Sequence, residues 1–211
     1  MRLPKSTKMW AKWWKNRRCN WAHAYGSTVD HPHRDMVLNA FKDCGKPRSV
    51  LEAGCATAPN LVRLKREWPD IEVGGFDVNE DAIKQAVTYI PDGKFYNHGI
   101  DEIYFSTNST TATLSDACLI YVERSKIKGV LKEFSRISTE YIVLCEFHST
   151  SWIERMALKL TSGYNAYDYK KLLSSLGYHD IQLKKIPAEI WPGMPWERYG
   201  YIITAKCPTL I

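Results

Sequence analysis

A short apolar run followed by a turn of small residues constrains this chain more than any other stretch. The run from Val50 to Ala53 has the character of a buried strand, and apolar residues at helical spacing follow Pro59, which suits the first turn of a helix. The intervening residues, 54–58, include only one glycine. The stretch therefore predicts a strand, a tight turn and a helix that together hold a ligand.

The acid at the end of this strand restricts the kind of ligand. Dinucleotide-binding folds place a pyrophosphate at this helix and need glycine at three positions of G-x-G-x-x-G. Here Glu52 precedes the turn, and Pro59 stands where the third glycine would be. A phosphate would meet a carboxylate, so we expect a ligand without a phosphate at this point.

A second apolar run, residues 71–79, contains the acid Asp77 at the end of its strand-like part. A carboxylate at the end of the second strand of a doubly wound sheet can accept both hydroxyls of a ribose. The two runs together predict a ligand that contains a ribose.

These residues resemble the first two motifs of the class I S-adenosylmethionine-dependent methyltransferases. The first motif is D/E-x-G-x-G-x-G, and Glu52 and Gly54 match it, whereas Ala56 and Ala58 stand where the family prefers glycine. Asp77 matches the ribose-binding acid. The resemblance spans roughly residues 34–206 and implies S-adenosylmethionine as cofactor and S-adenosylhomocysteine as product. The cofactor-binding residues that it implies are Glu52, Gly54, Cys55, Ala56, Asn60, Asp77, Val78, Gly99, Ile100, Tyr121 and Arg34.

Strands and helices alternate along the rest of the chain, which predicts a parallel sheet covered on both faces. Two closing strands, 181–186 and 199–205, joined by a turn-rich loop, predict an antiparallel hairpin. We therefore expect a doubly wound, Rossmann-like three-layer α/β sandwich of about seven strands. The chain is expected to form a single domain over residues 1–211, with its core in 34–206 and a helical insertion in 149–163 near the substrate.

Two further strands are predicted on either side of an amphipathic helix. The apolar run 116–122 is interpreted as the fourth strand and 141–148 as the fifth, whereas 106–115 is rich in Ser and Thr and is interpreted as an exposed loop.

Ligands in such sheets bind at the carboxyl ends of the strands, which draws attention to Tyr121, Glu123, Glu146 and His148. We choose His148 as the catalytic base over Glu146, His98 and Tyr121, because an imidazole with an unperturbed pKa near 6.5 accepts a proton at neutral pH. Each of these residues could instead be structural, and His148 could begin the next helix.

The first thirty residues are basic and rich in tryptophan. Residues 1–29 carry a charge of +7, which leaves −1 on residues 30–211. The cations are Arg2, Lys5, Lys8, Lys12, Lys15, Arg17 and Arg18, and the tryptophans are Trp10, Trp13, Trp14 and Trp21. Residues 1–30 are interpreted as an amphipathic helix packed on the domain, as a lid over the active site, or as a patch that recruits nucleic acid, and we favour the lid.

The composition, 45% hydrophobic and 25% charged, is that of a globular protein, and the sequence shows neither a membrane span nor a signal peptide. We expect a cytoplasmic protein without a membrane partner; its oligomeric state stays open. The six cysteines form no C-x-x-C pair, so no metal or disulfide framework is expected.

The methyl acceptor is predicted by elimination. The sequence has no Asn/Asp-Pro-Pro-Tyr/Phe run and no Pro-Cys pair, which mark nucleobase methyltransferases. We expect transfer to an oxygen or nitrogen of a small molecule or sugar. The alternatives are a nucleic-acid methyltransferase, or a non-catalytic scaffold whose Ala-for-Gly changes close the pocket.

Overall fold

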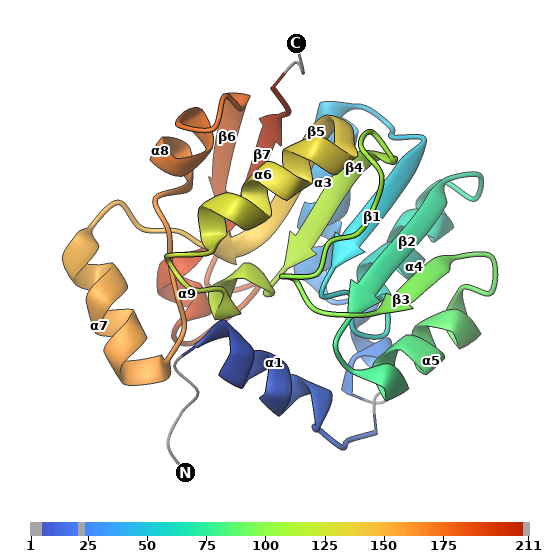
Figure 1. Ribbon diagram of the computed structural model, residues 1–211, viewed down its shortest axis with the longest axis horizontal. Coiled ribbons are helices and arrows are strands. Elements are labelled where there is room, and N and C mark those ends of the chain that lie inside the picture. The colour runs from blue at the N-terminus through green and yellow to red at the C-terminus, as the bar shows by residue number, and fades with distance from the viewer. Residues whose placement is uncertain (1–5, 21–23, 209–211) are drawn as a thin grey trace.

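A computed structural model describes residues 6–20 and 24–208. Within these residues the strands form one seven-stranded sheet in the order β3-β2-β1-β4-β5-β7-β6 (Figure 1). The strands are β1 (Ser49–Ala53), β2 (Glu72–Asp77), β3 (Lys94–Asn97), β4 (Thr110–Asp116), β5 (Ser138–Phe147), β6 (His179–Lys185) and β7 (Gly200–Lys206). Strands β1 to β5 pair in parallel, and β7 pairs antiparallel with both β5 and β6. The predicted parallel sheet with an antiparallel hairpin is confirmed.

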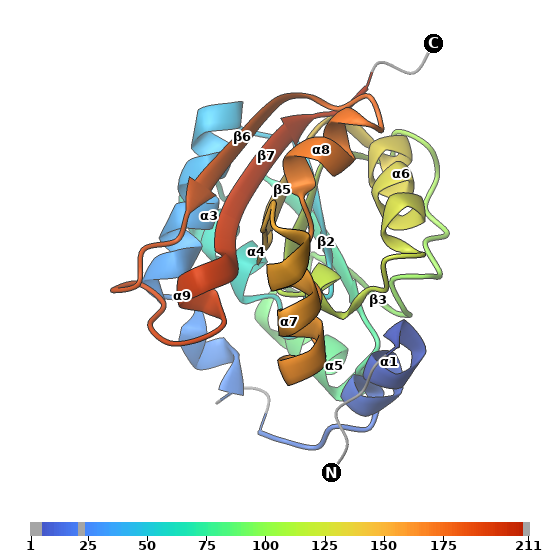
Figure 2. The same ribbon diagram turned by 90° about the vertical axis from the view of Figure 1, so that its left-hand side faces the viewer.

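Helices cover both faces of the sheet, as Figure 2 shows for α3 and α6 on opposite sides. Side chains alternate between the two cores: Val50 packs with the helices of one face and Leu51 with those of the other. One face carries α3 (Pro32–Cys44), α4 (Pro59–Glu67) and α5 (Glu80–Tyr89), and the other carries α6 (Ile127–Ile137) and α8 (Tyr169–Ser174).

Helix α6 illustrates how the pattern produces the packing. Its buried apolar residues are Ile127, Val130, Leu131, Phe134 and Ile137, at the 3.6-residue spacing seen in the sequence. Burying each such side chain contributes about 1.5–3 kcal/mol. The helix is therefore fixed on the sheet along one face, with its polar residues in solvent.

The fourth strand differs from the prediction. It runs over Thr110–Asp116, the stretch predicted to be an exposed loop, whereas 117–122 holds a turn and the short 3-10 helix η2 (Leu119–Tyr121). The hydroxyls of β4 are paired inside the sheet, since Thr113 Oγ1 lies 2.6 Å from Ser138 Oγ, and Ser115 Oγ donates to Glu146. Burying a hydroxyl costs little free energy when it is hydrogen-bonded, and Thr favours strands. A run rich in Thr and Ser can therefore form a central strand of the sheet.

Several short elements gather at the carboxyl ends of the central strands. They are α1 (Thr7–Lys15), η1 (Gly26–Thr28), η2, α7 (Trp152–Ser162) and α9 (Trp196–Tyr199). Figure 1 shows α1 below these strand ends and α7 to its side. The helix predicted within residues 149–163 is thus present as α7. No described helix is long and apolar enough to cross a membrane.

Candidate active site

A cavity of about 440 Å³ lies at the carboxyl ends of β1, β2 and β4. The turn after β1 forms one wall. Gly54 has φ 69°, and a Cβ there would lie 2.6 Å from Cys118 Sγ, so glycine is required for both conformation and space. Cys55 and Cys118 also line this wall as free thiols.

The two alanines of the turn adopt the conformation that normally favours glycine. Ala56 has φ 47° and Ala58 φ 61°, both left-handed, which costs an L-residue roughly 1–2 kcal/mol each. The cavity beside them remains open. The open cavity does not support the alternative of a scaffold whose Ala-for-Gly changes close the pocket; the cost of the alanines falls on the backbone.

Asp77 lies at the end of β2 and lines the cavity. Its Oδ2 accepts the Ala56 backbone N–H at 3.1 Å and its Oδ1 accepts that of Asn79 at 2.9 Å. Burial raises the pKa of Asp77, and the backbone N–H groups oppose that shift. The turn and the acid thus fix each other at the point where a ribose is expected.

Asn60, in the first turn of α4, connects the ends of β1 and β4. Its Nδ2 donates to Glu52 Oε1 at 2.7 Å and to Asp116 Oδ2 at 3.0 Å. Burial raises the pKa of Glu52 to about 8, against the hydrogen bond from Asn60. The other oxygens, Glu52 Oε2 and Asp116 Oδ1, are buried and have no hydrogen-bond partner among the described residues.

Asp116 was not predicted as a site residue, because the fourth strand was predicted over 116–122 and Asp116 then stands at its start. It closes β4 as Asp77 closes β2, and that repetition was the available signal. His33 Nε2 lies 3.1 Å and Arg34 Nη1 3.3 Å from Asp116 Oδ2. Burial alone would raise the pKa of Asp116, but His33 and Arg34 outweigh it and hold that pKa well below its usual range.

All three nitrogens of the Arg34 guanidinium donate hydrogen bonds within the protein. It donates from Nε to Thr28 O at 2.7 Å, from Nη2 to Thr28 Oγ1 at 2.8 Å, and from Nη1 to Asn60 Oδ1 at 2.7 Å. The predicted contact of Arg34 with a cofactor carboxylate would compete with these bonds. Its evident effect is to hold Asn60 and Asp116 in place.

Helix α3, which carries Arg34, starts at Pro32 with His31 as its cap. The His31 side chain accepts the His33 backbone N–H and so caps the helix. The cap leaves His33 in the first turn, where its ring lines the cavity.

The wall beyond Asp77 is apolar. Val78, Ile100 and His98 line it, and the His98 ring stacks on Phe76 with centroids 4.5 Å apart. Gly99 is not among the lining residues: its carbonyl accepts the Glu102 N–H within the loop. Gly99 and Ile100 were both predicted as cofactor-binding residues, and the structure brings only Ile100 of the two to the cavity.

Aromatic side chains form the remaining wall, and α1 supplies part of it. Trp10, only 4% exposed, lies 4.7 Å from Tyr121 and 5.6 Å from Tyr164 between ring centroids. Trp14 also lines the cavity. The tryptophans of α1 therefore point inward as the amphipathic pattern predicted; Trp21, Arg2 and Lys5 lie outside the described residues.

Glu146 and the chosen base His148, two of the four candidate bases, lie outside the cavity lining. Glu146 is fully buried and accepts from Ser115 Oγ and from the backbone N–H groups of residues 118–120. His148 Nδ1 accepts the Tyr169 backbone N–H at 3.2 Å. Both are occupied in holding the loops after β4 and β5. Tyr121 lines the cavity, from η2 rather than from a strand end, and so does His98, the remaining candidate base.

Comparisons with known proteins agree with this geometry. Residues 50–140 match the family model described as a methyltransferase domain. Among solved structures, a chain of the Haloferax volcanii complex between the Trm112 methyltransferase activator and a methyltransferase is 16% identical, with a TM-score of 0.68 over 90% of this chain and 96% of that chain. The cyclase SpnF is 13% identical, with a TM-score of 0.72 over 99% and 98%.

A third similar structure contains the cofactor. Magnesium protoporphyrin IX methyltransferase from Synechocystis PCC 6803 with bound S-adenosylmethionine is 13% identical, with a TM-score of 0.60 over 93% of this chain and 88% of that chain. At such identities the likeness shows the fold. The chain thus has the Rossmann-like fold of these methyltransferases, and its residues 50–140 match the methyltransferase-domain model.

Proposed function

We propose that the cavity binds S-adenosylmethionine and that the enzyme methylates an oxygen or nitrogen of a small molecule with an apolar body. The observation that carries the proposal is the pair of unpartnered buried oxygens, Glu52 Oε2 and Asp116 Oδ1. Buried carboxylate oxygens are normally hydrogen-bonded. A ligand that brings a cationic donor, as the ammonium group of this cofactor does, would hold Glu52 in its charged form and satisfy both oxygens.

The remaining walls support the same fit. Asp77 would accept the ribose hydroxyls, and Val78 and Ile100 would enclose the adenine, since these three residues line the cavity in sequence from β2 to the loop after β3. The cofactor supplies an electrophilic methyl group on a sulfonium. Arg34 acts as a positioning residue that keeps Asn60 and Asp116 facing this ligand.

The acceptor would lie against the aromatic wall. Trp10, Tyr121 and Tyr164 present ring surfaces there, with Phe147 and Trp196 beside them. Such a wall favours a planar or apolar acceptor, because its ring faces bury apolar area and offer few hydrogen bonds. This supports a small molecule over a free sugar.

The acceptor must lose a proton, and we propose His33 in place of His148 as its base. His33 lines the cavity and packs against Trp191 with centroids 4.3 Å apart. Its Nε2 lies 3.1 Å from Asp116 Oδ2 and its Nδ1 2.6 Å from His31 Nδ1, so an acceptor would have to displace His31 to reach Nδ1. A carboxylate that bonds one imidazole nitrogen orients the ring. His148 has no comparable access.

Helix α1 is proposed to act as a lid. Thr7, Trp10, Ala11 and Trp14 all line the cavity, so a bound acceptor would lie beneath the helix. A lid of this kind excludes water from the reacting groups and orders them.

A screen of methyl acceptors with tritiated cofactor tests the proposal. We expect label to be transferred to apolar small molecules that carry a hydroxyl or amine, and to be lost in Asp77→Asn. Transfer only to oligonucleotides would favour the nucleic-acid alternative. Binding of S-adenosylhomocysteine without transfer to any class would favour a scaffold.

A further inference from the structure

Helix α7 turns its large apolar side chains toward solvent. Trp152, Ile153 and Leu160 are 67%, 63% and 76% exposed, and Met156 is also exposed. Their spacing puts the four on one side of the helix, here called the α7 stripe. Leu158, on the opposite side, is buried against the domain. The amphipathic pattern of α7 therefore leaves its wider apolar side without a partner.

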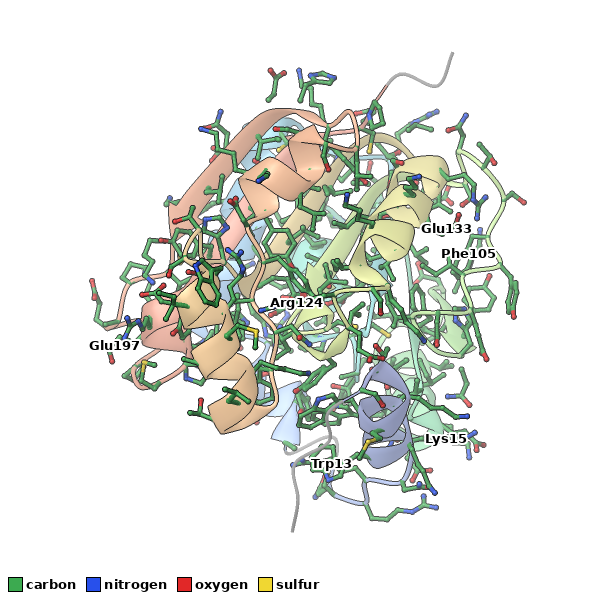
Figure 3. All side chains as sticks on the ribbon, turned by 60° about the vertical axis from the view of Figure 1, so that its left-hand side comes forward. Trp13, Lys15, Phe105, Arg124, Glu133 and Glu197 are labelled. Carbon is green, nitrogen blue, oxygen red and sulfur yellow. The ribbon has the colours of Figure 1, made fainter. Side chains whose placement is uncertain are left out.

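Cations lie beside the stripe. Arg124 Nη1 contacts Met156 Sδ at 3.2 Å, and Figure 3 shows Arg124 between α6 and α7. At the end of α7, Lys159 Nζ donates to Gly163 O at 2.9 Å.

The same carbonyl joins α7 to α1. Gly163 O also accepts from Trp10 Nε1 at 3.4 Å, which brings the end of α7 against α1. Figures 1 and 2 show the two helices at the same end of the molecule. Lys8, Lys12 and Lys15 are exposed on α1, and none of them forms an ion pair with a described residue.

We propose that the α7 stripe and the α1 lysines form a docking surface for an anionic phospholipid membrane. An interfacial helix lies in the membrane plane with its apolar side in the boundary between headgroups and acyl chains, and Trp is favoured at that depth. Each lysine near an anionic surface adds about 1 kcal/mol of attraction. The proposal departs from the expectation of no membrane partner, which rested on the lack of a spanning segment; an interfacial helix needs no such segment.

Two other occupants fit these observations less well. A stable dimer buries about 800 Å² on each partner, which four side chains on one helix do not supply, and α1 would bring like charges together. Nucleic acid would pair with the lysines but would leave Ile153 and Leu160 without a role.

Co-sedimentation with vesicles tests the surface independently of any methyl transfer. The intact protein is expected to pellet with vesicles of phosphatidylcholine mixed with phosphatidylglycerol, to bind pure phosphatidylcholine more weakly, and to dissociate as salt rises. Ile153→Ser combined with Leu160→Ser should weaken the partition at least tenfold, and so should glutamate at Lys8, Lys12 and Lys15.

A matched control replaces exposed apolar side chains elsewhere: Val87→Ser combined with Tyr104→Ser should bind like the intact protein. Circular dichroism checks that all variants remain folded. Failure to bind anionic vesicles, or an equal loss in the control, would overturn the proposal. So would a dimer in light scattering that the stripe variant abolishes, or salt-dependent binding of oligonucleotides without binding of vesicles.

Discussion

Thr7 and Glu123, 116 residues apart, exchange two hydrogen bonds: the Thr7 backbone N–H donates to Glu123 Oε2 at 3.1 Å, and the Glu123 N–H donates to Thr7 Oγ1 at 2.9 Å. Asn79 Nδ2 donates to Trp14 O at 2.8 Å near the other end of α1. Helix α1 is therefore fastened at both ends over the cavity. A helix held in this way can detach locally without unfolding of the domain, as the proposed lid requires.

The first prediction concerns this fastening. Glu123→Ala removes the acceptor of the Thr7 N–H, and the loss of about 1–2 kcal/mol should raise the open population roughly 5- to 30-fold. Trypsin cleavage at the α1 lysines should accelerate accordingly. Glu102→Ala, at an exposed position, is the control. Unchanged cleavage in Glu123→Ala would show that this contact does not hold the lid.

The second prediction follows from Glu52. Its folded pKa of about 8 lies above the ordinary value of 4.5 for a glutamate, so the folded state binds the proton more tightly. The stabilisation from this group is complete below about pH 4.5 and is lost as the pH rises through 8. Across this window the free energy of unfolding should fall in the parent without ligand and should fall less in Glu52→Gln. The difference between the two falls should reach about 2–5 kcal/mol.

Urea unfolding at several pH values measures this difference. Exposed Glu102→Gln should follow the parent protein. Parallel curves for Glu52→Gln and the parent would mean that Glu52 is already charged in the folded protein near neutral pH.

The third prediction uses the left-handed alanines. Alanine-to-glycine replacement in an exposed helix costs about 1 kcal/mol, as expected for Ala157→Gly in α7. At Ala56, with φ 47°, glycine relieves backbone strain, so Ala56→Gly should be neutral or stabilising by up to about 1 kcal/mol. Urea unfolding compares the two variants. An equal cost in both would argue against the strained turn.

The sequence predicted the strands that are apolar runs, and it misplaced β4, which is rich in Thr and Ser. Strands β1, β2 and β5 are apolar runs, whereas β4 is a Thr- and Ser-rich strand whose hydroxyls pair with Ser138 and Glu146 across the sheet. Those partners are distant in sequence, so their effect is invisible locally. The fourth strand was therefore predicted over 116–122, which put Asp116 at its start and not at its end.

Some cavity residues can be predicted from local sequence, and others depend on tertiary packing. Asp77 and Glu52 follow from a motif at strand ends, but the access of a histidine to a cavity depends on packing. His148 is next to a strand end and yet is held by Tyr169, whereas His33 reaches the cavity from a helix start. The amphipathic spacing of residues 7–15 predicted the inward tryptophans but not the surface that receives them.

The fourth prediction tests His33. His33→Asn should lower kcat roughly 10²-fold while S-adenosylhomocysteine affinity stays nearly constant, because the change removes a proton acceptor and not a cofactor contact. His98→Asn, on the apolar wall, should change the cofactor KM more than kcat. Normal turnover in His33→Asn would end the assignment.

The most direct test of the account is a calorimetric titration with S-adenosylhomocysteine of the parent protein and of Asp77→Asn. The parent should bind one equivalent, and the variant should bind about 10- to 100-fold more weakly, because hydrogen bonds to a charged group contribute about 1.5–3 kcal/mol. Asp92→Asn, at an exposed acid, should bind as the parent does. Equal affinity in Asp77→Asn, or no binding by the folded parent, would contradict the cofactor site described above.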